Sequence, residues 1–111
     1  MVTETIQDHS VVLTTDSTLN AIARAIAPYL VAHPNAKFDQ YRQSQTNVRL
    51  RIIDEDFVGM DDGDRLDLIG GYIDQLDDAT ANQVTFLSLV TPGELSDSHV
   101  NYEFENPSWT D

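Results

Sequence analysis

The sequence predicts a small α+β domain in which two helices cover one face of a three-stranded mixed sheet. The first observation is the stretch 48–94, which alternates like a strand, then repeats at helical spacing, then runs apolar like a second strand. The second is a strand-length segment, residues 37–43, that precedes this stretch by a short polar turn. The third is an amphipathic helix pattern that begins near residue 16. The predicted order is therefore α-β-β-α-β, followed by a C-terminal extension.

With 111 residues, the chain has the length of one domain. We expect three segments, an N-terminal arm, the α+β domain and an acidic C-terminal extension, over residues 1–15, 16–95 and 96–111. The arm alternates weakly at Val11 and Leu13, so it forms either an added strand or a loose arm. In the extension, Val100, Tyr102 and Phe104 alternate with polar residues, and a disordered acidic tail rarely keeps that many aromatic residues. We expect this extension to dock on the domain.

The first helix is predicted to begin after Asp16, because an aspartate followed by Ser and Thr is a helix-start signal. Its apolar face is formed by five residues at helical spacing, Leu19, Ile22, Ala23, Ile26 and Leu30. Pro28 lies inside this pattern and has no backbone N–H. We therefore expect the helix to kink at Pro28 or to end near Ala27.

Two strands are predicted after this helix, over residues 37–43 and 48–54, and the short turn between them makes them an antiparallel hairpin. Val48, Leu50 and Ile52 alternate with two arginines, which is typical of a strand that buries one face. The strand ends at three adjacent acidic residues, 54–56, which resist burial.

The second helix is predicted to begin at Asp61, a good N-cap residue, and to extend to about Leu76. Phe57 is the lone large apolar residue before this helix, so we expect its ring to fill the core. The pair Gly70-Gly71 lies in mid-helix, where glycine is unfavourable. It indicates that another element packs very close at this point or that the helix bends.

The last strand, residues 84–90, is apolar on both faces, as a central strand is, and we expect it to run parallel to residues 48–54. Eight residues should share one core, Ile22, Ile26, Leu50, Ile52, Phe57, Ile69, Ile73 and Phe86. Helices on one side leave the other face of the sheet uncovered. We expect Val100, Tyr102, Phe104 or Trp109 to cover it, or else a second copy of the chain.

The composition argues against several kinds of chemistry. The chain has no cysteine, which excludes disulfides, thiolate nucleophiles and cysteine-ligated zinc or iron. Its three histidines are far apart, and an EF-hand pattern counted from Asp54 fails at Val58 and Arg65. No Gly-x-Ser-x-Gly motif is present. We therefore expect no enzyme, no metal and no cofactor. No apolar run is long enough to cross a bilayer and no signal pattern is visible, so we expect a cytoplasmic protein of bacterial type.

The net charge of −13 is distributed unevenly along the chain. Residues 1–53 hold five basic residues against four acidic ones, whereas residues 54–111 hold Arg65 alone against fifteen. The acidic half is either a solvated surface or a docking face for a basic partner. The predicted hairpin brings basic residues together, and we take four arginines as a candidate partner-binding surface, Arg42, Arg49, Arg51 and Arg65. Nucleic acid is an unlikely ligand for so acidic a chain.

The order of elements and several short motifs resemble the BolA-like proteins over about residues 16–95. The motifs are Phe57-Val58-Gly59, Arg65, and Thr91-Pro92-Gly93-Glu94 at the end of the last strand. The resemblance implies a class II KH-like α+β fold. It also implies a non-enzymatic partner of a monothiol glutaredoxin that shares a [2Fe-2S] cluster, or a DNA-binding regulator.

The departures from this family concern its functional residues. The family's Arg-His-Arg is Arg65-Leu66-Asp67 here, its cluster-ligating histidine aligns with Gln83 or Val84, and the Gly-x-x-Gly loop of KH domains is absent. The resemblance therefore supports the fold better than the function. We expect a non-catalytic protein-interaction module. The alternatives are a divergent BolA-like accessory factor in iron–sulfur cluster trafficking and a nucleic-acid-binding regulator, which the acidic charge disfavours. The partner of the module is another protein or a second copy of the chain.

Overall fold

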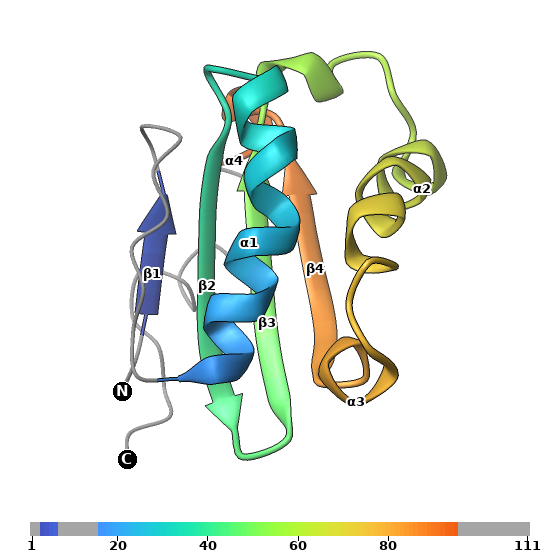
Figure 1. Cartoon of the computed structure of the whole chain (residues 1–111). Coiled ribbons are helices and arrows are strands. Elements are labelled where there is room, and N and C mark those ends of the chain that lie inside the picture. The colour runs from blue at the N-terminus through green and yellow to red at the C-terminus, as the bar shows by residue number, and fades with distance from the viewer. Residues whose placement is uncertain (1–2, 7–15, 96–111) are drawn as a thin grey trace.

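The computed structural model describes residues 3–6 and 16–95, in which helices pack on one face of a mixed β-sheet (Figure 1). The described elements are β1 (Thr3–Ile6), α1 (Ser17–Ala32), β2 (Lys37–Ser44), β3 (Asn47–Ile53), the 3-10 helix η1 (Glu55–Phe57), α2 (Asp62–Ile73), α3 (Asp78–Ala81), β4 (Val84–Val90) and α4 (Pro92–Leu95). The predicted α+β class and the order α-β-β-α-β are confirmed. The single-turn helices α3 and α4 and the turn η1 are additions that the sequence pattern did not predict.

The sheet has the strand order β1-β2-β3-β4 within the described residues. β2 pairs antiparallel with β3, and β3 pairs parallel with β4, as predicted. The N-terminal arm adds a fourth strand, β1, antiparallel to β2, so of the two structures expected for the arm the added strand is the one observed. This strand lies at Thr3–Ile6, whereas the alternation at Val11 and Leu13 lies outside the described residues.

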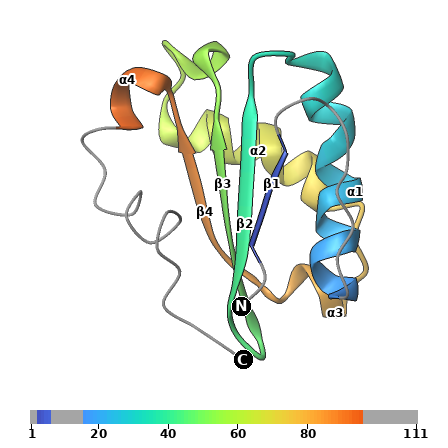
Figure 2. The ribbon, with the colours of Figure 1, turned by 90° about the vertical axis from the view of Figure 1, so that its left-hand side faces the viewer.

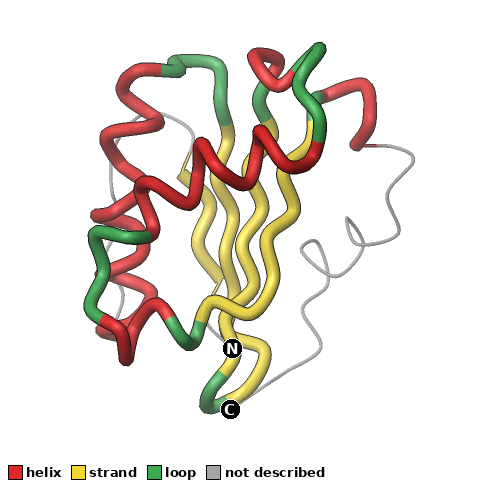
Figure 3. The backbone as a smooth tube through the Cα atoms, turned by 90° about the vertical axis from the view of Figure 1, so that its right-hand side faces the viewer, coloured by secondary structure: helices red, strands yellow, loops and turns green. Residues whose placement is uncertain are grey.

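The two long helices begin where the sequence predicts, because each has an aspartate cap. Asp16 accepts hydrogen bonds from the backbone N–H groups of Thr18 and Leu19, and Asp61 accepts one from Asp64. Figure 2 shows α1 on one side of the twisted sheet and α4 at the end of β4 on the other, and Figure 3 shows the long helices beside the strands.

Of the two effects expected of Pro28, a kink or an end of the first helix near Ala27, the end is wrong, because α1 continues to Ala32. A proline at this position leaves the carbonyl of Arg24 without its helical donor. Pro28 and Arg24 both lie on the exposed side of α1, where water can hydrogen-bond to that carbonyl. The buried face of α1 is therefore not interrupted.

The core lies between the helices and the sheet. It consists of Leu19, Ile22, Ala23, Ile26, Tyr29, Leu30, Ala36, Phe38, Val48, Leu50, Ile52, Phe57, Ile69, Ile73 and Leu89. The predicted core is confirmed except at Phe86. This residue is opposite Arg49 in the register of β3 and β4, and the Arg49 guanidinium lies 5.3 Å from the centre of its ring, so Phe86 belongs to the second face. The residues of β4 that pack in the core are Val84, Leu87 and Leu89.

The Gly70-Gly71 pair is not a point of close packing. A Cβ atom added at either glycine would meet no other atom within 4 Å, so the predicted close approach of another element is wrong. Gly71 instead lines an open groove of about 420 Å³ between α1 and α2, together with Pro28 and Tyr72. The glycines therefore leave space between the two helices.

The second face of the sheet was predicted to be covered by Val100, Tyr102, Phe104 or Trp109, and these four residues lie outside the described residues. Among the described elements, α1 and α2 both pack on the first face. None of the described helices is long and apolar enough to span a membrane.

Candidate functional site

The four arginines proposed as one partner-binding surface lie in three different places. Arg42 is on the helix side of β2, where its Nε lies 2.6 Å from Oδ2 of Asp16. It also donates to the carbonyls of Ser44 and Gln45 and to the side chain of Gln83. The hydrogen bond from Arg42 lowers the pKa of Asp16. Arg42 thus ties the start of α1 to the β2–β3 turn.

Arg49 and Arg51 point to the opposite face of the sheet. Arg51 is 4% exposed, and its Nε donates to Oδ2 of Asp39 at 2.8 Å across the β2–β3 pair. Arg49 lies over the ring of Phe86 on β4. The charge of Arg51 is therefore held inside the protein by a buried carboxylate, and only Arg49 of these two is partly exposed.

Arg65 joins four elements with its guanidinium. Its Nε donates to the carbonyl of Met60, its Nη2 to that of Phe57, and its Nη1 to that of Leu89 in β4. Both terminal nitrogens also contact Glu94 in α4, with Nη1 2.7 Å from Oε1. This hydrogen-bonded pair raises the pKa of Arg65 and lowers that of Glu94 to about 2.

The predicted surface of four arginines is therefore not a single surface. Arg51 and Arg65 are buried and bonded within the chain, so neither presents its charge to a partner. Asp39 is directly opposite Arg51 in the hairpin register. The predicted hairpin contained this pairing, but the sequence argument considered the basic residues without the acidic ones that face them.

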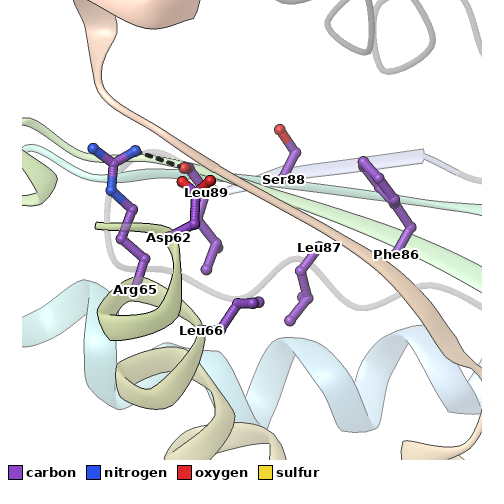
Figure 4. A pocket seen from close by; sticks show the side chains of 7 residues that line it. All are labelled: Asp62, Arg65, Leu66, Phe86, Leu87, Ser88 and Leu89. Carbon is purple, nitrogen blue, oxygen red and sulfur yellow. Dashed lines mark hydrogen bonds between the residues drawn. The ribbon is translucent and has the colours of Figure 1, made fainter. Parts of the chain in front are cut away.

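A different surface, the groove beside the outer edge of β4, has the form of a binding site. It has a volume of about 260 Å³ and is lined by Asp62, Arg65 and Leu66 of α2 and by Phe86, Leu87, Ser88 and Leu89 of β4 (Figure 4). Because four consecutive residues of β4 contribute to it, the groove follows the strand. Leu66 is 48% exposed, which is unusual for a large apolar side chain on a helix that also contributes to the core.

The backbone of β4 directs hydrogen-bonding groups into this groove. The carbonyl of Val90 accepts from Asp54, so it points toward β3. Successive residues of a strand point their backbone groups to opposite sides, and the Leu89 carbonyl accordingly points away from β3 and accepts from Arg65. The register with β3 shifts at Thr85, so this alternation holds only for the residues after it. Leu87 therefore has the same orientation as Leu89. Its N–H and C=O groups face the side of β4 where no strand lies in the described part of the chain.

The surroundings of the groove are acidic. Asp61, Asp62 and Asp64 begin α2 and are all exposed. Arg65 is the single basic residue after residue 53, and its charge is paired with Glu94. The groove therefore lies in a negative potential that favours a basic ligand.

A second cluster of polar groups lies where β3 ends, beside the end of α1. His33 Nδ1 lies 2.7 Å from Oδ2 of Asp56 and 3.3 Å from Oδ2 of Asp54. The hydroxyl of Tyr29 donates to the same Asp54 oxygen at 2.5 Å, and burial together with this bond raises the pKa of Tyr29 above its usual range. Sequence spacing did not reveal this cluster, because His33 is more than twenty residues from either aspartate.

The two positions that the sequence resemblance assigns to the cluster ligand of BolA-like proteins, Gln83 or Val84, lie at the opposite end of the sheet from His33. Gln83 comes directly before β4, and its side chain accepts from Arg42 and donates to Thr18. His33 is beside Asp54, where β3 and β4 end. The fold therefore does not bring this imidazole to the place of the family's histidine.

Comparison of the chain with protein-family models, with curated proteins and with solved structures found no match. The resemblance to BolA-like proteins stays a prediction from the sequence motifs.

Proposed function

We propose that this protein is a non-catalytic protein-interaction module that binds an extended, basic segment of a partner protein along the outer edge of β4. The observation that carries the proposal is the groove beside that edge, where outward backbone groups of β4, an exposed apolar side chain and an acidic helix start lie together. We also propose that the protein acts in the cytoplasm.

An extended peptide would bind as an additional strand. Its backbone would exchange hydrogen bonds with the outward N–H and C=O groups of Leu87, which supplies affinity without regard to sequence. An apolar side chain of the peptide would fill the groove between Leu66 and Leu87. Basic side chains would lie near Asp62 and its acidic neighbours, which selects for lysine and arginine and raises the association rate.

The test uses a short synthetic peptide in which lysine alternates with valine, and its counterpart in which glutamate replaces lysine. We expect the basic peptide to shift the backbone amide NMR signals of Leu87 and Leu89, with an affinity that falls as salt is added. The acidic peptide should bind at least tenfold more weakly because of like-charge repulsion.

The matched variants are Leu87→Pro and Leu87→Val. Proline removes the outward N–H without breaking a hydrogen bond to β3, whereas valine keeps that N–H. Binding should be lost in Leu87→Pro and kept in Leu87→Val. Leu66→Lys, on an exposed position, gives a second test, since it places a positive charge in the groove. Binding that survives both Leu87→Pro and Leu66→Lys would show that the ligand docks elsewhere.

The second candidate, a divergent BolA-like accessory factor in iron–sulfur cluster trafficking, is supported by the element order α-β-β-α-β. Such a protein would bind a monothiol glutaredoxin, but it would not ligate a [2Fe-2S] cluster with its own residues. Of the two residues that the resemblance places at the family's ligand position, Gln83 is an amide that already bonds to two side chains, and Val84 has no ligand atom.

Mixing the chain with a cluster-loaded monothiol glutaredoxin and recording visible circular dichroism tests this expectation. The glutaredoxin spectrum should stay unchanged. A stable heterodimer whose spectrum changes to that of a histidine-ligated cluster, and loses this change in His33→Ala, would contradict it.

A further inference from the structure

We propose that His33, Asp54 and Asp56 form a binding site for one divalent transition-metal cation. The three residues come from three different elements, the end of α1, the end of β3 and the turn η1. Each offers one ligand atom, and these atoms lie within 4.8 Å of one another. The sequence analysis predicted no metal, because it considered only the spacing of histidines and acidic residues along the chain.

Local structure holds two of the three donors in place. His33 caps the end of α1 with its backbone N–H, which donates to the carbonyl of Tyr29, and its ring stacks on the Tyr29 ring with 4.0 Å between centroids. Asp54 is buried, and its second oxygen accepts the N–H of Asp56 as the cap of η1. The Tyr29 hydroxyl orients the Asp54 oxygen that faces His33. Metal ligands are commonly oriented by such outer hydrogen bonds.

The distances fit a cation after a small movement of Asp56. With metal–ligand bonds of about 2.0–2.2 Å, two ligands of a tetrahedral site are about 3.3–3.5 Å apart. His33 Nδ1 and Asp54 Oδ2 are 3.3 Å apart. His33 Nδ1 and Asp56 Oδ2 are closer, at 2.7 Å, because a proton joins them in the metal-free protein. The Asp56 side chain is 59% exposed, so it has room to move outward and to leave a coordination position for water.

The charge of this region favours a cation. The last turn of α1 carries no basic residue, so the negative end of the helix dipole adds to the charge of the two carboxylates. Glu55, the acidic neighbour between them in sequence, accepts a hydrogen bond from Asn35 instead of a charged group. In the described part of the chain, the ion-pair partner of Asp54 and Asp56 is His33. A divalent cation would neutralise both carboxylates.

The donor set indicates the class of metal. One imidazole nitrogen and two carboxylate oxygens suit Zn²⁺, Co²⁺ or Mn²⁺, whereas Mg²⁺ and Ca²⁺ prefer sites made of oxygen alone. We therefore expect Zn²⁺ to bind at one equivalent in the presence of excess Mg²⁺. Excess Mg²⁺ also occupies non-specific sites on the acidic surface. Zn²⁺ binding at this site is therefore distinguished from non-specific binding of cations to surface carboxylates.

The experiment is a calorimetric titration of the full chain with ZnCl₂ in excess MgCl₂, paired with NMR signals of the His33 ring nitrogens. We expect one bound Zn²⁺ and a large shift of the Nδ1 signal. Asp56→Asn and His33→Gln should each weaken binding by at least tenfold. Asp67→Asn, which removes an exposed carboxylate from α2, should leave the affinity within about twofold. Asp54 is kept unchanged because it is buried and caps η1.

Two results would overturn the proposal. One is the absence of saturable binding at one equivalent when Zn²⁺ reaches millimolar concentration. The other is binding that persists at wild-type affinity in both Asp56→Asn and His33→Gln, since the metal would then be held elsewhere. Circular dichroism of each variant confirms that its fold is intact before its affinity is compared.

Discussion

Replacing Arg65 by methionine tests whether its guanidinium holds four elements together. Methionine keeps much of the aliphatic packing but leaves the carbonyls of Met60, Phe57 and Leu89 without their donor. A buried acceptor that loses its partner costs about 1–3 kcal/mol. Water can reach part of this site from the side of Glu94, which is 48% exposed, so we expect a total loss of about 3–5 kcal/mol rather than the full sum.

Two matched variants separate the hydrogen bonds from the charge. Arg65→Lys keeps the charge, but one ammonium group cannot serve three carbonyls, so it should lose at least half as much stability as Arg65→Met. Glu94→Gln removes the charged partner from the exposed side and should cost only about 1 kcal/mol. Urea unfolding monitored by far-UV circular dichroism gives the free energy of unfolding of each variant. The values are compared where the dependence on urea concentration has the same slope. A loss below about 1 kcal/mol in Arg65→Met would refute the reasoning, because the guanidinium network would then contribute nothing net.

Three further predictions use the same unfolding measurement. Gly70→Ala and Gly71→Ala should each stabilise the protein by up to about 1 kcal/mol, because an added Cβ meets no atom within 4 Å; a loss of stability would show that the space is needed. Phe57→Ala should cost about 3–5 kcal/mol, since the ring is fully buried, and a cost below about 1 kcal/mol would contradict its place in the core. Because the pKa of Glu94 is lowered from 4.5 to about 2, the stability that this carboxylate contributes is complete above pH 4.5 and is lost as the pH falls through about 2. The difference between wild type and Glu94→Gln should therefore shrink over that range, and a difference that stays constant would exclude the ion pair as its source.

The parts of the fold that depend on local chemistry were predictable from the sequence. The caps at Asp16 and Asp61 are examples, because a carboxylate next to free backbone N–H groups begins a helix whatever surrounds it. Pro28 was misjudged because its effect depends on whether the freed carbonyl reaches water, which only the packing of α1 decides. Phe86 was misassigned because β4 is apolar on both faces, so alternation could not show which side faces the helices.

The candidate sites were less predictable, since each depends on residues that are distant in sequence. The β4 groove requires the position of α2 relative to the strand edge, and no local pattern gives that position. The carboxylate–histidine cluster requires the end of α1 to lie beside the end of β3, which joins His33 to Asp54 and Asp56. The prediction of an arginine surface failed for a different reason. The hairpin register places Asp39 opposite Arg51, so this ion pair could have been predicted from the sequence.

The short strand β1 has a practical consequence for any work with the purified protein. Its four residues pair only with residues 38–41 of β2, whose eight residues would otherwise form an open sheet edge. An uncovered strand edge is a template for intermolecular pairing and aggregation. A truncated form that begins at the first helix would therefore self-associate through β2, and an affinity tag is better attached to the other end of the chain.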